Sequence, residues 1–283
     1  MENDIILFML IGAVSQLVDG MLGMGFGTIS SSLLLTMGIH PRTSSSLIHT
    51  AEIFTSGTAA LSHIKLKNVR KKTVAVLALY GSLGGLAGAL LLTNVPTNWI
   101  KPFVAFYLLF LGISIIHKYF RLRKKGFQPF EIFPLRLVAQ LLNKVRLRVP
   151  GGVKPLSKIQ LGMLGITGGT LDAVGGGGWG AIVNTSLISK GQDPHKSIGS
   201  SCVAEFFVTL TTSIALFSLT ESFWWQACLG LVLGGVIMAP ISAILCKKIS
   251  SHVFLLVIGV LVTLLSINTL VNLGIDWYFL RLT

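Results

Sequence analysis

Four acidic residues, Asp19, Glu52, Asp172 and Glu205, lie inside long apolar stretches of this 283-residue chain. An ionised carboxylate at the centre of a membrane helix costs about 3 kcal/mol, so acids at such places usually serve a function or a structural pairing. For Glu52 and Glu205 two readings stay open. They are a coupling or gating carboxylate that takes up a proton, and a carboxylate that caps backbone N–H groups. For Asp19 and Asp172 the capping reading is favoured, with coupling or gating as the alternative.

Each aspartate is followed by a run of closely spaced glycines, over residues 23–27 in the first case and 175–180 in the second. Consecutive or alternating glycines unwind a helix, because their spacing does not place them together on one packing face. An unwound tip exposes backbone N–H groups, and the next helix begins there with its positive dipole end, so the tip favours an anion. The residues expected to bind the anion are Gly25, Gly27, Gly178, Trp179 and Gly180. The alternative is close helix packing.

A hydroxyl-rich turn follows a proline in two places, after Pro41 and after Pro194. Ordinary N-capping accounts for one or two hydroxyls in each turn, and the remaining hydroxyls are available to ligate an oxyanion. The candidates are Ser44, Ser45, Ser46, Ser197, Ser200 and Ser201. Three neighbours, Arg42, His49 and Lys196, carry groups that can neutralise the anion. For His49 a packing role on an apolar helix is favoured, with a ligand role as the alternative.

The sequence argues against several other chemistries. Gly175, Gly177 and Gly180 match the spacing of a dinucleotide-binding loop, but that loop needs a strand before it and a soluble helix after it. The GxGD motif of an intramembrane aspartyl protease is absent, and the three cysteines form no CxxC pair. We therefore expect no catalytic residues, no metal and no cofactor.

The composition places these residues in a membrane, since apolar residues make up 52% of the chain and charged residues only 12%. A soluble domain carries about 25% charged residues. Two stretches, 5–37 and 158–190, are too long for one straight span and read as two helices joined at the glycine run. Six others are long enough for single spans, at about 43–63, 73–93, 99–119, 196–217, 223–246 and 252–273. The formal charge of +13 sits in short loops, which favours membrane lipid over nucleic acid as the partner.

The sequence also overlays itself at a shift of 153 residues, with fourteen identical positions between residues 12 and 58 and their counterparts. Residues 65–72 carry five positive charges and their counterparts at 218–225 carry none. Residues 94–98 are uncharged, whereas their counterparts begin with Lys247 and Lys248. Because positive loops stay in the cytoplasm, equivalent loops lie on opposite sides of the membrane, which predicts an inverted repeat.

The predicted fold is therefore an all-α polytopic membrane protein of two inverted repeats, with about ten membrane segments and both termini outside. The first repeat covers residues 1–119 and the second covers 158–283. The basic connection at 120–157 is expected to be cytoplasmic. Its amphipathic part, around 132–149, reads as an interfacial helix, with a disordered linker as the alternative.

One pattern occurs once in each half, beginning at Asp19 and at Asp172: Asp-x3-Gly-x-Gly-x-Gly, then Gly-x-x-Pro, a hydroxyl-rich turn and Ala-Glu. Over nearly the whole chain this resembles the sulfite exporter TauE/SafE family of membrane permeases. One departure is Met24, which stands where the second half has Gly177.

The resemblance implies movement of sulfur-containing or organic anions, such as sulfite, thiosulfate and sulfonates. We therefore expect a secondary transporter for a small anion, working by alternating access in a bacterial or archaeal plasma membrane. The alternatives are a passive anion channel and a membrane-embedded enzyme, and association into a homo-oligomer stays open.

Overall fold

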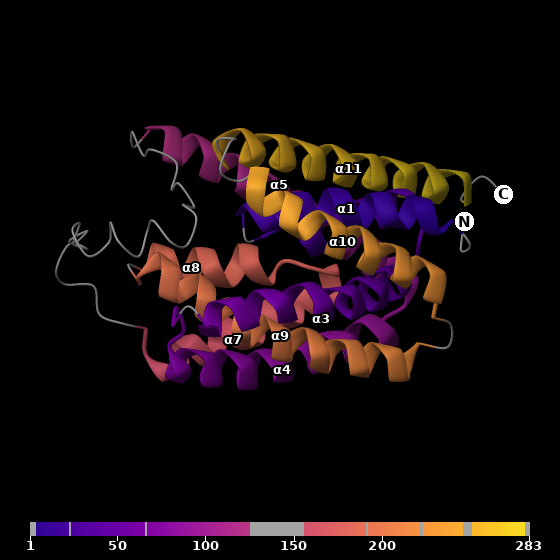
Figure 1. The fold of residues 1–283 in the computed structure, drawn as a ribbon. Helices are drawn as coiled ribbons and strands as arrows, with labels where there is room; N and C mark the ends of the chain where they lie inside the picture. The colour runs from indigo at the N-terminus through magenta and orange to yellow at the C-terminus, as the bar shows by residue number, and fades with distance from the viewer. Residues whose placement is uncertain are drawn as a thin grey trace.

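The computed structural model describes residues 4–22, 24–65, 67–124, 156–190, 192–220, 223–245 and 251–280, and within these ranges every regular element is a helix (Figure 1). The helices are α1 (Ile5–Leu22), α2 (Phe26–Thr36), α3 (Pro41–Lys65), α4 (Lys71–Asn94), α5 (Thr97–Lys124), α7 (Lys158–Gly175), the π-helical turn η1 (Gly180–Asn184), α8 (Thr185–Ser189), α9 (Pro194–Leu219), α10 (Trp225–Leu245) and α11 (Ser251–Leu280). The predicted interfacial helix at 132–149 lies outside the described residues.

Three of these helices contain segments long and apolar enough to cross a membrane by length and composition, at Lys71–Asn94, Asn98–His117 and Lys196–Leu219. Shorter apolar segments lie at Ile5–Asp19, Phe26–Thr36, Trp225–Ala239 and Gly259–Gly274. Large apolar side chains on the outer faces, such as Phe106 and Phe110 on α5, are exposed, as expected of a surface that contacts lipid. The sequence predicted six single spans. One of them, α3, has 25 residues but carries buried polar side chains along its length, so its apolarity is low.

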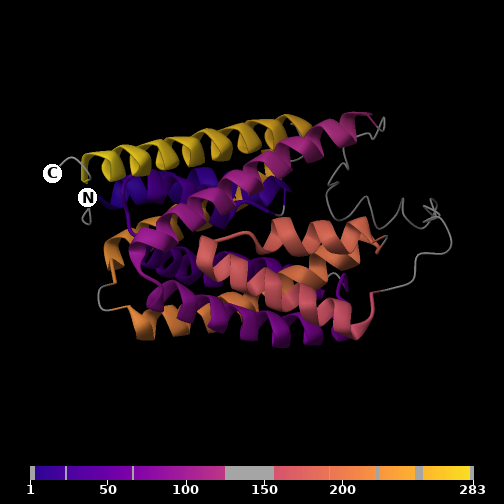
Figure 2. The same ribbon diagram turned by 180° about the vertical axis from the view of Figure 1, so that it is seen from behind.

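Both predicted helix breaks are present. α1 and α2 are separated at Gly25, where φ is +140°, and α7 ends before Gly176, Gly177 and Gly178, which all have positive φ. Positive φ is readily adopted only by glycine, so the glycine runs determine where each helix stops. After its break, the second segment turns back, and α8 returns toward the end of the bundle where α7 begins (Figures 1 and 2).

The sequence repeat is accompanied by a repeat of local structure. The backbone N–H of Ile39 donates to the Leu34 carbonyl at 3.0 Å, and 153 residues later the N–H of Gln192 donates to the Leu187 carbonyl at 3.2 Å. Both bonds close the turn at the end of the broken segment, just before the long helix that begins with a proline. Equivalent residues therefore form equivalent turns in the two halves.

Helices from the two halves are interleaved. α1 packs along α10 and α7 packs along α4, so each broken segment lies against a helix of the other half. Glycines allow these close approaches: a β-carbon on Gly12 would overlap the Leu231 backbone, and one on Gly169 would overlap the Gly81 backbone. In the same way, α3 of the first half packs along α9 of the second half, and α5 packs along α11. The halves thus share one helical bundle.

The two chain ends lie at the same end of this bundle (Figure 1). α5 ends and α7 begins at the opposite end, where α3 also ends and α4 begins (Figures 1 and 2). The positive charges of residues 65–72 are therefore at the end of the bundle from which the connection at 120–157 departs. Lys247 and Lys248 lie outside the described residues, and their cytoplasmic location stays a prediction.

Cysteine labelling checks this arrangement. Lys71 and Asn98 are both exposed. Lys71 begins α4, and Asn98 lies at the start of α5, just after the opposite end of α4. Because the basic end should face the cytoplasm, we expect a membrane-impermeant maleimide to label Asn98→Cys in intact cells and to label Lys71→Cys and Lys248→Cys only after the cells are opened. Strong labelling of Lys248→Cys in intact cells would contradict the inverted arrangement.

Candidate functional site

Each break is capped by the aspartate that precedes it. The backbone N–H of Trp179 donates to Asp172 Oδ1 at 2.8 Å, and that of Phe26 donates to Asp19 Oδ1 at 3.5 Å. Both bonds span seven residues, and each satisfies an N–H group at the start of the helix after the break. This is the geometry that the capping reading of the two aspartates expects, with the tighter bond in the second half.

The two breaks cross in direct backbone contact. A β-carbon on Gly177 would overlap the Gly27 backbone, and one on Gly27 would lie 2.7 Å from the Gly176 carbonyl oxygen. Since real β-carbons do not approach other atoms so closely, neither Gly27 nor Gly177 has room for a side chain. Gly177 is the repeat counterpart of Met24, and its contact with Gly27 is a physical reason for glycine at this position of the second half.

Side chains from two other helices support the second break. Tyr107 of α5 donates its hydroxyl to the Gly177 carbonyl at 3.3 Å, and its ring packs against Gly175. Ser31 of α2 donates its hydroxyl to the Gly176 carbonyl at 3.0 Å. Carbonyl groups freed by unwinding thus find donors inside the protein, as lipid depth requires.

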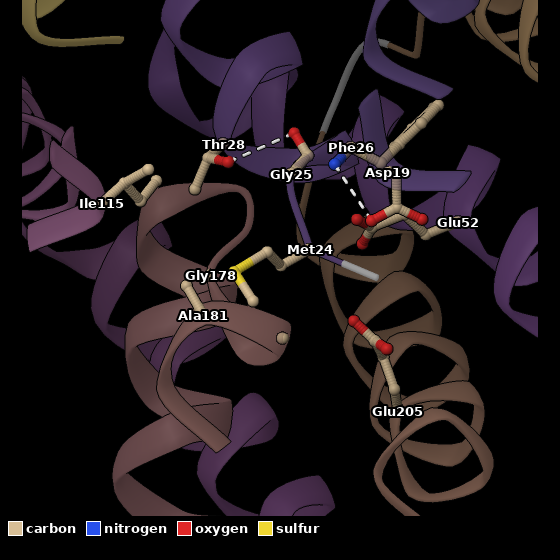
Figure 3. Close-up of a pocket in the computed structure, with 12 residues that line it drawn as sticks. Asp19, Met24, Gly25, Phe26, Thr28, Glu52, Ile115, Gly178, Ala181 and Glu205 are labelled. Carbon is tan, nitrogen blue, oxygen red and sulfur yellow. Dashed lines mark hydrogen bonds between the residues drawn. The ribbon is translucent and has the colours of Figure 1, made fainter. Parts of the chain in front are cut away.

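A small cavity of about 20 Å³ lies beside the crossing (Figure 3). That is room for about one water molecule. Its lining comes from both halves and consists of Asp19, Met24, Gly25, Phe26, Gly27, Thr28, Glu52, Ile115, Gly178, Gly180, Ala181 and Glu205. Carboxylates from α1, α3 and α9 therefore meet two unwound glycine segments around one space.

His49 connects the two halves close to Glu52, one of the residues that line this cavity. It is fully buried on α3, and its Nε2 lies 3.2 Å from Asp172 Oδ2 at the end of α7. Its Nδ1 lies 2.8 Å from the Ser45 carbonyl oxygen one turn earlier. Ser45 in turn donates its hydroxyl to the Ala173 carbonyl at 2.6 Å, so α3 is bonded twice to the end of α7.

Comparison with known proteins shows the family of the chain. The model of the sulfite exporter TauE/SafE family matches residues 8–269. The chain belongs to the sulfite exporter TauE/SafE family. It is also 34% identical over 273 residues to the probable membrane transporter protein YtnM of Bacillus subtilis (strain 168), an alignment that covers 95% of this chain and 84% of that protein. No solved structure matches. The protein is thus a transmembrane member of a transporter family, as the sequence resemblance indicates.

In this TauE/SafE protein the predicted site residues fall into two sets. The cavity is lined by four of the five predicted tip residues, Gly25, Gly27, Gly178 and Gly180, and by three of the four acids, Asp19, Glu52 and Glu205. The fourth acid, Asp172, lies beside His49, away from the cavity lining.

The second set lies outside the cavity lining. Trp179 is fully buried and donates its ring N–H to the Ser201 hydroxyl at 3.0 Å, while Ser200 accepts from the Arg70 N–H at 2.8 Å. Arg42 donates to the Leu92 and Val95 carbonyls at the end of α4, and Lys196 is exposed. Ser44, Ser46 and Ser197 are buried, and their hydroxyl oxygens have no hydrogen-bond partner within the described part of the chain.

Several lining residues were missed by sequence reasoning. Thr28 and Ala181 are repeat counterparts at the start of the helices after the breaks, so the repeat could have indicated them. Met24 was noticed only as a departure from the glycine pattern. Nothing in the sequence indicated Ile115 of α5 or Tyr107, which supports the second break, because neither stands in a repeated or polar motif.

The backbone crossing generates a stability prediction. Gly177→Ala should lower the melting temperature in detergent by about 6 °C or more, since overlap with a packed backbone costs roughly 3 kcal/mol. Gly38→Ala is the matched control: Gly38 also has positive φ, at +82°, but nothing lies within 4 Å of its β-carbon position. It should cost only about 1–2 kcal/mol of backbone strain. Equal losses in the two variants would contradict the crossing.

Proposed function

We propose that this protein is a secondary transporter that moves a small anion, a sulfur-containing oxyanion or an organosulfonate, by alternating access. The observation that carries the proposal is the convergence of both glycine breaks and three carboxylates on one cavity between the halves. The family description names a sulfite exporter, and YtnM carries the name of a probable membrane transporter. Both favour transport over enzymatic activity.

The helix starts at the breaks are the proposed anion-binding elements. α2 begins at Phe26 beside the cavity, and its first N–H groups point toward the break. Two carboxylates lie at these donors: Asp19 accepts the Phe26 N–H, and Glu52 Oε1 lies beside Gly27. The carboxylates therefore occupy donor groups that a bound oxyanion would use. Substrate and carboxylate would compete for the same N–H groups.

The size of the cavity supports a closed conformation. An oxyanion or sulfonate is larger than the single water molecule for which about 20 Å³ provides room. Binding therefore requires the breaks or the long helices to move apart. A passive channel would instead need a continuous path wide enough for the anion, so the small size of this space favours alternating access.

The acids also impose an electrostatic condition. An ionised carboxylate about 4 Å from an anion repels it by about 4 kcal/mol at an effective dielectric constant near 20. Glu52 and Glu205 line the cavity, so an anion enters only when their charge is removed, compensated or turned away. We assign a coupling or gating role to this pair, with Asp19 and Asp172 fixing the breaks.

The pairing of helices between the halves supports the same mechanism. The 153-residue shift relates α1 to α7 and α4 to α10, so the packed pair α1–α10 is the counterpart of the packed pair α7–α4. In the other two packed pairs, α3–α9 and α5–α11, each helix packs against its own counterpart. A two-fold relation between the halves produces that pairing. Together with the exchange of loop charge, it favours two halves that face opposite sides of the cell membrane and open alternately around one site.

A thermal-shift assay on the purified protein tests the proposal. Sulfite, thiosulfate or methanesulfonate should raise the melting temperature in a saturable manner, whereas acetate and chloride at equal ionic strength should not. Glu205→Gln removes one negative charge from the cavity wall. It should lower the anion concentration needed for half-maximal stabilisation by about tenfold, or about 1.4 kcal/mol. No shift with any sulfur oxyanion or sulfonate would refute the proposed substrate class.

A further inference from the structure

Three potential metal ligands gather beside the cavity: His49, Glu52 and Asp172. Their ligand atoms lie within 4.8 Å of one another, and the residues are 0%, 7% and 2% exposed. His49 and Glu52 are three residues apart on α3 and so share one helix face, while Asp172 comes from α7 of the other half. Within the described ranges this is the one group of three such side chains that comes so close.

In two of the three side chains, one polar atom is hydrogen-bonded within the protein and a second polar atom is available to bind a metal. The Ser45 carbonyl can only accept a hydrogen bond, so His49 Nδ1 carries the proton and Nε2 presents a lone pair when the ring is neutral. Asp172 Oδ1 is bonded to the Trp179 N–H, which leaves Oδ2 facing His49. A histidine that ligates a metal usually donates its other N–H in this way to a carbonyl or carboxylate.

The third side chain supplies an independent observation. Glu52 is more than nine-tenths buried, and its Oε2 has no hydrogen-bond partner among the described residues. Its other oxygen, Oε1, lies beside Gly27 of the first break. A buried carboxylate oxygen without a partner is costly, and this one belongs to the residue that completes the three-ligand group.

The facing atoms also need a positive charge between them. His49 Nε2 and Asp172 Oδ2 are 3.2 Å apart, and both are acceptors when the imidazole is neutral. A single proton on the histidine would pair with Asp172 and leave Glu52 uncompensated. A divalent cation would balance both carboxylates and use the imidazole as a neutral ligand.

We infer that His49, Glu52 and Asp172 form a binding site for a divalent transition-metal cation of the Zn²⁺ or Co²⁺ type. One imidazole nitrogen with two carboxylate oxygens suits these ions, whereas Mg²⁺ and Ca²⁺ prefer oxygen ligands alone. Metal–ligand bonds of 2.0–2.2 Å place tetrahedral ligands about 3.4 Å apart. His49 Nε2 and Asp172 Oδ2, at 3.2 Å, are already close to that spacing. The ligand atoms of the group lie within 4.8 Å of one another, so they would have to approach by about 1.4 Å at most, which rotation of the flexible Glu52 side chain can provide.

Glu52 belongs to this three-residue group and also lines the cavity. Such a cation would offset the negative charge of the cavity wall, which is the condition for anion entry if the proposed transport function holds. The metal site itself stands on the three side chains alone.

Cation binding is measured on protein purified without a histidine tag and stripped with a chelator. We expect one Co²⁺ per chain, seen as a d–d absorption band and displaced by Zn²⁺. Glu52→Gln and His49→Ala should each weaken Zn²⁺ binding at least tenfold in calorimetry. Glu205→Gln is the matched comparison. It also removes one carboxylate from the cavity wall, but it leaves all three proposed ligands in place, so it should weaken Zn²⁺ binding clearly less than Glu52→Gln does.

Size-exclusion profiles establish whether each variant is folded. If His49→Ala does not fold, the test rests on Glu52→Gln, which keeps the shape of the side chain. Absence of stoichiometric binding would overturn the inference. So would equal loss in Glu52→Gln and Glu205→Gln, or no loss in Glu52→Gln. No anion is present in this titration, so its outcome is independent of whether the protein transports sulfur oxyanions.

Discussion

The backbone contact between Gly27 and Gly177 is the constraint on which the rest of this structure depends. Two helices break inside the bundle, and their unwound segments cross with no room for a side chain on either glycine. The crossing brings Asp19 and Asp172 to the starts of two helices and places Glu52 and Glu205 around one space. A cavity shared by both halves results from this contact, since residues of both halves line it.

Unwound backbone at membrane depth must find its hydrogen-bond partners within the protein. Here Asp172, Tyr107 and Ser31 serve the second break, and Asp19 serves the first. The aspartates therefore have a structural reason to be present. Glu52 has an additional carboxylate oxygen that no described group satisfies, which separates its role from theirs and points to a ligand, a proton or a cation.

Local chemistry could be predicted from the sequence, and long-range packing could not. The breaks and their capping aspartates were predictable because glycine at positive φ and an acid near free N–H groups are short-range requirements. The role of Arg42, which binds carbonyls at the end of α4, depends on a helix fifty residues away. Tyr107 and Ile115 reach the site only because α5 packs beside it. The apolar pattern also predicted α3 as an ordinary membrane span, whereas α3 carries many polar side chains that are buried inside the bundle.

The central claim is that both breaks form one anion site that opens alternately to the two sides of the membrane. Its most direct test is counterflow in proteoliposomes loaded with unlabelled thiosulfate and diluted into radiolabelled thiosulfate. The account predicts saturable uptake of label that is accelerated by anion inside the vesicles and inhibited by sulfite outside. Uptake that is absent, or that neither saturates nor responds to the internal anion, would contradict it.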